Sequence, residues 1–243
     1  AGDTGRAGGC MVAGNVGRWV CLLAMRPGLG PSVAGGLADP VLELHAANGD
    51  LIMSTDNGKE TQQTDIEATG VPPQNDLESA IVATLDPDAY TAIVRGKGGT
   101  SGIGLVEGYD LDQPADAQLA NISTPGSVKT GSNVLIGGFI LGNGNGTTNV
   151  VIRALGPSLP VTGALADPTL ELHDANGALV QSNDNWMDNS AADQAELTAN
   201  QLAPTNDLDS AMIVTLPTGA YTAVVAGKNG ATGVALVEAY RLP

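Results

Sequence analysis

The chain has 243 residues, with 26 Asp and Glu against 10 Lys and Arg, which gives a formal net charge of −16. Such an acidic surface repels nucleic acid and anionic membranes, and no apolar run is long enough to span a bilayer. Aromatic residues make up only 3% of the chain, so Gly, Ala, Val, Leu and Thr must supply most of the packing. The sequence starts at Ala1, and we expect a mature, processed form.

The first 32 residues are the least regular part of the chain. They contain Cys10 and Cys21 on either side of residues 14–17, Gly-Asn-Val-Gly, which is a hairpin turn signal. If the two flanking strands pair, the cysteines face each other at a separation that suits a disulfide. Two free buried thiols are the alternative.

From residue 36 onward the sequence is a succession of short apolar strands with frequent turns. In the first half we expect strands at 41–45, 50–54, 79–85, 89–94 and 102–109, with a short helix near 65–68. In the second half we expect them at 118–123, 133–141, 149–155, 169–173, 179–182, 210–216, 220–226 and 233–242. This pattern predicts an all-β fold of antiparallel β-sandwiches, jelly-roll or immunoglobulin-like.

The two halves are copies of one another. Residues 38–57 match residues 166–185 at 14 of 20 positions, and residues 75–112 match residues 206–243 at 21 of 38. Each copy is long enough to bury its own core. We therefore expect two tandem domains, residues 1–112 and 116–243, joined by a short linker at 113–115.

Three segments of the second copy carry a resemblance to a known repeat: residues 119–124 (LANIST), 134–139 (VLIGGF) and 153–158 (RALGPS). They resemble a repeat of large secreted and surface proteins of environmental bacteria. The later part, from residues 167–172 to 220–225, is similar to the β-sandwich of pre-peptidase C-terminal type. The resemblance covers the second copy and about residues 36–112 of the first. It implies an extracellular, non-catalytic β-sandwich that is often tandem and sometimes binds Ca²⁺.

An acidic loop in each copy is the best candidate for a ligand site. Carboxylate and amide oxygens are the ligands that Ca²⁺ prefers, although the loops lack EF-hand spacing. The alternative is that Asp and Asn side chains cap turns by hydrogen bonding to the backbone. The candidate Ca²⁺ ligands are Asp184, Asn185, Asp188 and Asp167 in the second copy and Asp56 in the first.

Two glutamates interrupt otherwise apolar strands, and a partly buried glutamate needs a partner. We expect Glu238 to pair with Arg153, and Glu107 with Arg26, as structural ion pairs. The two histidines hold equivalent positions in different copies and lack partners at metal spacing. The sequence contains no Gly-x-Ser-x-Gly motif, and no serine triad can be assembled from it. We therefore expect no catalytic residue and no enzymatic activity.

Two glycosylation sequons begin at Asn121 and Asn145. Asn121 lies in an expected strand, whereas Asn145 lies in an expected exposed turn and is the better acceptor. Chance occurrence is the alternative.

The first copy lacks a counterpart of the strand that opens the second copy. An unpaired sheet edge invites a strand from another molecule, and a head-to-tail contact between unlike ends of one chain builds an open filament. We expect a cell-surface or extracellular structural protein that polymerises with copies of itself, without membrane insertion. The exchanged strand is either the one containing Leu119, Ala120, Asn121 and Ile122 or the terminal segment 234–242. The alternative is a carbohydrate-binding or accessory module of a secreted peptidase, with Trp186 as its one aromatic candidate.

Overall fold

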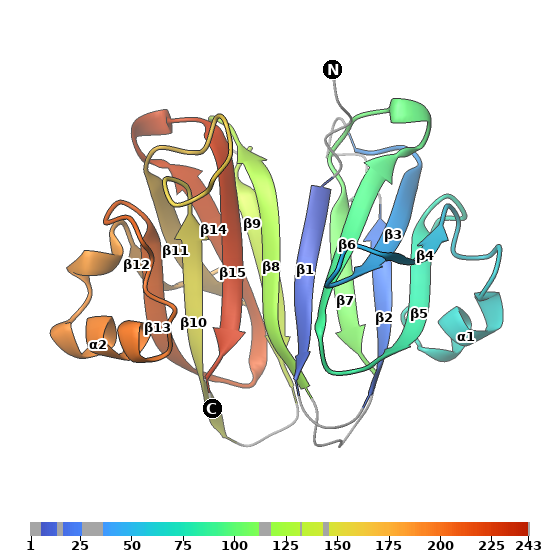
Figure 1. Cartoon of the computed structure of the whole chain (residues 1–243), viewed down its shortest axis with the longest axis horizontal. Helices are drawn as coiled ribbons and strands as arrows, with labels where there is room; N and C mark the ends of the chain where they lie inside the picture. The colour runs from blue at the N-terminus through green and yellow to red at the C-terminus, as the bar shows by residue number, and fades with distance from the viewer. Residues whose placement is uncertain are drawn as a thin grey trace. The chain divides into compact units, whose positions relative to one another are not determined.

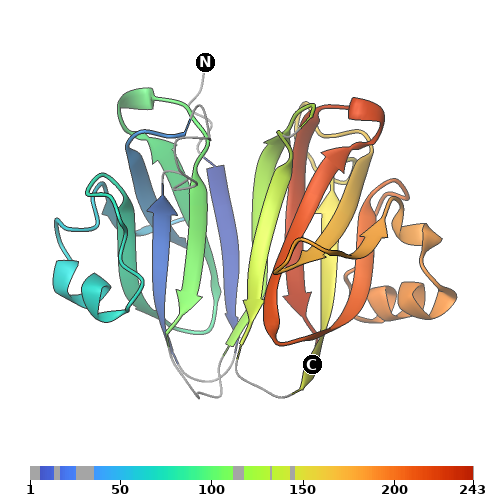
Figure 2. The ribbon, with the colours of Figure 1, turned by 180° about the vertical axis from the view of Figure 1, so that it is seen from behind.

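The computed structural model describes residues 6–13, 17–25, 36–111, 118–131, 133–142 and 146–242. The chain divides into two compact units, residues 1–120 and 121–243. Each unit is built from two packed antiparallel sheets, seen from the two sides in Figures 1 and 2. The expected linker at 113–115 lies outside the described residues.

In the first unit, one sheet has the strand order β1-β6-β3-β4 and the other has the order β5-β2-β7. The strands are β1 (Arg6–Ala13), β2 (Arg18–Met25), β3 (Pro40–Ala46), β4 (Leu51–Thr55), β5 (Ser79–Leu85), β6 (Ala89–Gly96) and β7 (Leu105–Asp110). A short helix, α1 (Gln63–Ala68), lies beside β5 (Figure 1), and a 3-10 turn, η2 (Lys97–Gly99), precedes β7.

In the second unit, the sheets have the orders β12-β11-β14-β9 and β13-β10-β15-β8. The strands are β8 (Gln118–Val128), β9 (Leu135–Leu141), β10 (Thr147–Leu155), β11 (Pro168–Asp174), β12 (Leu179–Asn183), β13 (Ser210–Pro217), β14 (Gly219–Gly227) and β15 (Gly233–Arg241). The helix α2 (Ala191–Ala199) and the 3-10 turns η3 (Trp186–Asp188) and η4 (Lys228–Gly230) complete the unit.

The repeated strands β3 and β11 show how the sequence builds each core. Leu42 and Leu44 in β3 are fully buried, and so are Leu170 and Leu172 in β11. Alternate residues of a strand point to opposite sides of a sheet, so the polar residues between these leucines face outward. Burying each leucine stabilises the fold by about 1.5–3 kcal/mol, which fixes the register because a slip of one residue would expose all of them.

A second, smaller apolar cluster lies on the outer face of β10 and β13. The residue Leu197 of α2 is fully buried there beside Val151, and Trp186 packs against the same cluster. The sequence did not lead us to expect α2. Its start is nevertheless encoded, because Ser190 Oγ accepts a hydrogen bond from the Asp193 amide and so caps the helix.

These observations confirm the all-β fold with antiparallel sheets. None of the helices in the described part of the chain is long and apolar enough to cross a membrane.

The expected Cys10–Cys21 disulfide was wrong. Both cysteines are free thiols, because β1 and β2 do not form a hairpin: β1 pairs with β6 and β2 lies between β5 and β7. Cys10 packs against the main core of the first unit, whereas Cys21 belongs to the cluster around Ile66 of α1. The alternative of two free, sheltered thiols describes the structure.

Candidate functional site

The outer edge of β7 is the main structural difference between the two units. In the second unit β15 lies between β10 and β8, with Val237 opposite Thr124 and Ala239 opposite Ile122. In the first unit β7 pairs with β2, and among the described residues no strand lies on its other side. The first unit therefore has a three-stranded sheet where the second has a four-stranded sheet.

The strand β15 pairs with β8, and β7 carries nearly the same side chains as β15. Residues 105–109 read Leu-Val-Glu-Gly-Tyr, and residues 236–240 read Leu-Val-Glu-Ala-Tyr. The one difference replaces Ala239 by the smaller Gly108. The side chain of Leu105 is 39% exposed. A strand that fits the edge of β15 would therefore meet nearly the same side chains on β7.

The strand β8 contains the four residues for which we expected strand exchange. The chain from Leu119 to Ile122 lies within β8, and Asn121 is opposite Tyr240 of β15. The sequon residue Asn121 is thus half-buried in a paired strand. The other sequon residue, Asn145, lies outside the described residues.

Arg153 and Glu238 form the expected ion pair across β10 and β15. Arg153 Nε lies 3.0 Å from Glu238 Oε2, and Nη2 lies 2.5 Å from the same oxygen. The other guanidinium nitrogen, Nη1, donates to the carbonyl of Leu202 at 2.9 Å. The Tyr240 hydroxyl donates to Glu238 Oε1 at 2.8 Å, and burial raises the pKa of Tyr240 to about 12. The Arg153 guanidinium and the Glu238 carboxylate are therefore held by contacts within the second unit.

The counterpart in the first unit is only partly described. Glu107 Oε2 accepts a hydrogen bond of 2.9 Å from the Tyr109 hydroxyl. Burial, followed by this hydrogen bond, raises the pKa of Tyr109 to about 12. Arg26 lies outside the described residues, so the expected Glu107–Arg26 pair stays a prediction.

A lysine joins two of the candidate calcium ligands in the second unit. Lys228 Nζ lies 2.5 Å from Asp184 Oδ2 and 3.6 Å from Asp167 Oδ2. The Lys228 amide also donates to the carbonyl of Asp167 at 2.9 Å. The hydrogen bond to Asp184 is the main cause that raises the pKa of Lys228, so the ammonium stays charged at neutral pH.

The same arrangement occurs in the first unit. Lys97 Nζ contacts Asp56 and lies 3.7 Å from Asp39 Oδ2, and the Lys97 amide donates to the Asp39 carbonyl at 2.9 Å. Each lysine starts a 3-10 turn whose second residue is left-handed, with φ of 64° at Gly98 and 55° at Asn229. Gly and Asn adopt this conformation most readily, which explains how a Gly-Lys-x-Gly sequence directs the lysine onto the two aspartates.

Calcium fits this set of ligands poorly. Three side-chain oxygens of the second unit are buried and accept no hydrogen bond from the described residues: Asp167 Oδ1, Asp184 Oδ1 and Asn185 Oδ1. The same is true of the Oδ1 atoms of their counterparts in the first unit, Asp39, Asp56 and Asn57. Those oxygens could face a cation, but the lysine already places a positive charge between the two carboxylates, and like charges at such a distance repel. Asp188 does not join them, since its Oδ2 accepts from Asn185 Nδ2 at 3.2 Å. The described residues contain no group of three His, Cys, Asp or Glu side chains that could hold a metal.

The remaining candidates also have structural surroundings. Trp186 is half-buried against the outer cluster of the second unit instead of standing out as a sugar-binding platform. Each histidine contacts the glutamate two residues earlier, at 3.1 Å for His45–Glu43 and 3.0 Å for His173–Glu171. These hydrogen bonds are the main cause that raises the pKa of both histidines.

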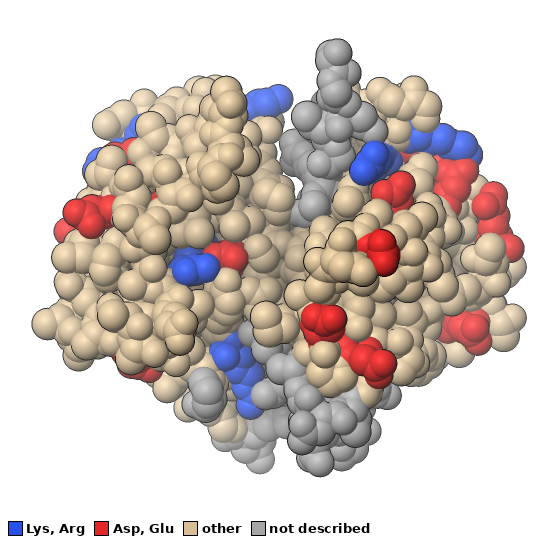
Figure 3. Space-filling view, in the orientation of Figure 1, with Lys and Arg blue, Asp and Glu red and all other residues tan. Residues whose placement is uncertain are grey.

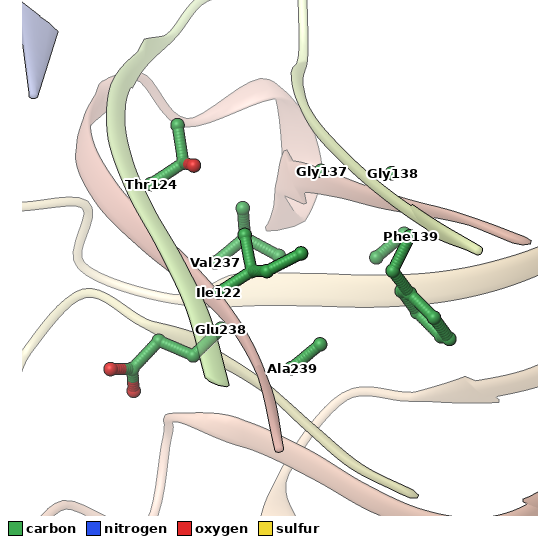
Figure 4. A pocket seen from close by; sticks show the side chains of 9 residues that line it. Ile122, Thr124, Gly137, Gly138, Phe139, Val237, Glu238 and Ala239 are labelled. Atoms are coloured by element: carbon green, nitrogen blue, oxygen red, sulfur yellow. The ribbon is translucent and has the colours of Figure 1, made fainter. Parts of the chain in front are cut away.

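A narrow cavity lies between β8, β9 and β15 in the second unit (Figure 4). Its volume of about 10 Å³ is at the lower limit for one water molecule. Gly137 lines it, and a side chain there would meet Val237 at 2.8 Å, so the two sheets approach closely at this point. The carboxylate of Glu238 points away from the cavity. This cavity is a packing defect too small for a ligand.

Charged side chains are unevenly spread over the face drawn in Figure 3. Asp and Glu side chains gather over the first unit on this face. Acidic clusters on the surface are expected for a chain with a net charge of −16.

No known protein family and no curated protein matches the chain. The similarity to pre-peptidase C-terminal-type domains therefore stays a prediction. A search of solved structures finds distant viral matches. The STIV MCP is 14% identical with a TM-score of 0.25, over 96% of this chain and 92% of that one. A chain of Sulfolobus Turreted Icosahedral Virus is 13% identical with a TM-score of 0.24, over 96% of this chain and 86% of that one. Infectious bursal disease virus VP2 is 16% identical with a TM-score of 0.20, over 94% of this chain and 58% of that one. TM-scores this low assign no role to the chain.

Proposed function

We propose that this chain is a non-catalytic structural subunit that assembles with copies of itself into a filament or fibre at the cell surface. The observation that carries the proposal is the edge of β7, which has no partner strand among the described residues while its counterpart β15 is paired with β8. An unpaired edge exposes a row of backbone donors and acceptors that another strand satisfies.

The strand that fits this edge best is β8 of another copy. Of the residues of β15 that pair with β8, the stretch 236–240 is repeated on β7 except for Gly108 in place of Ala239. In the second unit Ser123 Oγ also donates to Glu238 at 3.3 Å, and Glu107 offers the same carboxylate on β7. Because the donor comes from one repeat and the acceptor from the other, the contact joins unlike surfaces, and such a contact builds an open filament when the rotation between copies does not close a ring.

Light scattering over a range of concentrations tests the proposal. The wild-type protein should grow beyond a monomer, and negative-stain microscopy should show linear particles. Leu105→Lys places a charge on the β7 edge and should keep the protein monomeric, because charges on edge strands prevent strand addition. Leu77→Lys is the matched control, since Leu77 is 45% exposed in a loop of the same unit. A wild-type monomer at every concentration, or equal assembly of Leu105→Lys, would contradict the proposal.

We also infer that the lysines, rather than Ca²⁺, neutralise the aspartate pairs of the two units. The support is the 2.5 Å contact of Lys228 with Asp184, together with its repetition at Lys97 and Asp56. This inference concerns stability and is independent of filament formation.

A further inference from the structure

A pocket of about 210 Å³ opens in the first unit between α1 and the loop that precedes β5. Its apolar walls are Gly58, Ile66, Pro72 and Pro73. The pocket is smaller than the sites of drug-sized ligands, which are about 300–1,000 Å³, so it suits a single ring system.

The backbone around the pocket matches that of the second unit. The backbone amide of Gly58 donates to the carbonyl of Glu78 at 2.9 Å, and the backbone amide of Trp186 donates to the carbonyl of Asp209 at 2.8 Å. The turn that follows is also the same, with N···O distances of 3.1 Å between residues 60 and 57 and 2.9 Å between residues 188 and 185. Gly58 is therefore the structural counterpart of Trp186, and this position of the first unit carries no indole ring. Trp19 of β2 packs against the same cluster around Ile66 but does not line the pocket.

The walls that hold the Trp186 ring are retained in the first unit. Trp186 belongs to the cluster that contains Leu197, Leu202 and Ala203. At the offset of 131 residues that relates residues 75–112 to residues 206–243, these positions become Ile66, Val71 and Pro72. Ile66 and Pro72 line the pocket, and Val71 packs beside Ile66. Equivalent apolar residues thus pack with an indole in one unit and lie at a pocket in the other.

We propose that this pocket binds a planar aromatic ring of about the size of indole, in a neutral or cationic form. The ring belongs either to a small molecule or to a side chain presented by a polypeptide. Filling the pocket removes the exposed face of Pro72 from water, which is the favourable term in such binding, while the buried Ile66 forms the floor. This proposal does not depend on filament formation.

The charges at the rim define which rings are accepted. Lys59 Nζ lies 2.5 Å from Asp76 Oδ1, so that lysine is already neutralised. Glu67 and Glu78 also line the pocket, which leaves an excess of negative charge. Carboxylate oxygens accept hydrogen bonds from ring N–H groups and attract ammonium groups, whereas a ligand carboxylate would be repelled.

Titrations followed by nuclear magnetic resonance test the proposal with indole, tryptamine and indole-3-acetate as probes. Indole and tryptamine should shift the amide signals of Gly58 and Ile66 saturably. Indole-3-acetate should bind at least about tenfold more weakly, which corresponds to about 1.4 kcal/mol. N-acetyl-Gly-Trp-Gly-amide separates the two sources: binding supports a ring presented by a polypeptide, and its exclusion while indole binds supports a free molecule.

Two matched variants complete the experiment. Gly58→Trp should fill the pocket and abolish binding, and its Cβ needs only small shifts because it would lie 3.3 Å from Ala80 Cβ and Pro73 Cγ. Trp186→Gly should open a corresponding pocket in the second unit and add a second binding site. Shifts in the wild type that are absent from Gly58 and Ile66, equal affinity for indole-3-acetate, or undiminished binding by folded Gly58→Trp would overturn the proposal.

Discussion

Arg153 and Glu238 are joined through two guanidinium nitrogens, Nε at 3.0 Å and Nη2 at 2.5 Å from Glu238 Oε2. Both side chains are nearly buried, with 13% and 8% of their surface exposed. The pair therefore holds β10 and β15 together under the loop that contains Leu202.

Replacing Glu238 by Gln should destabilise the protein by about 3 kcal/mol, because it leaves the Arg153 charge buried without its counter-charge. Urea unfolding at neutral pH measures this loss. Glu171→Gln is the control in the same unit, since that side chain is 53% exposed and its loss should cost less than about 0.5 kcal/mol. Equal stability of Glu238→Gln and the wild type would show that the pair is unimportant for folding.

The lysine between Asp167 and Asp184 should make the melting temperature insensitive to calcium. We expect the same value with Ca²⁺ and with EDTA, because the Lys228 ammonium supplies the positive charge. Lys228→Met should lower the melting temperature and make it rise again with Ca²⁺, whereas Lys228→Arg should resemble the wild type. A wild-type melting temperature that falls in EDTA would instead identify a resident metal.

The two free thiols should react slowly in the folded protein. Burial raises the pKa of Cys10 and Cys21 from 9.0 to about 11, which lowers the thiolate fraction at pH 8 about 100-fold. Reaction with a disulfide reagent should therefore be at least tenfold faster after unfolding in guanidinium chloride. If the unfolded, unreduced protein shows no reactive thiol, the cysteines are bonded after all.

The histidines should contribute stability that declines as the pH rises. The hydrogen bond to Glu171 is the first cause that raises the pKa of His173 above 6.5 in the folded state. A raised folded-state pKa means that this stabilisation is fully present below the unfolded value of 6.5 and is lost as pH rises through the folded value. Proton resonances should report a higher pKa for His173 in the wild type than in Glu171→Gln, while His45 serves as an unchanged internal reference. Equal pKa values of His173 in the wild type and in Glu171→Gln would show that the hydrogen bond to Glu171 does not raise this pKa.

The repeated part of the fold could be predicted because its information is local. Leu42 and Leu44 alternate with polar residues, and the same pattern recurs at Leu170 and Leu172, so both the strands and their buried faces follow from the sequence. The helix α2 was missed because its residues are mostly small or polar and only Leu197 is buried. The Ser190 cap with Asp193 was the available signal.

The features that the sequence could not predict depend on contacts between distant residues. Lys228 lies in a Gly-Lys-x-Gly stretch that we interpreted as a turn, which it is, but its partner Asp184 is 44 residues away. The position of β2 in a different sheet from β1 likewise depends on pairing with β5 and β7. A turn signal between two cysteines shows that the chain reverses there, and it does not show which strands then pair.

Amide hydrogen exchange along β7 tests the central claim most directly. In the monomer, the outward-facing amides of residues 105–109 should exchange quickly, while those of β15 are protected by pairing with β8. At concentrations where the protein assembles, the β7 amides should become protected by β8 of another copy, and the β15 amides that β8 leaves should lose protection. Leu105→Lys should prevent both changes. Protection of β7 that is the same in monomer and assembly would contradict assembly by strand addition at this edge.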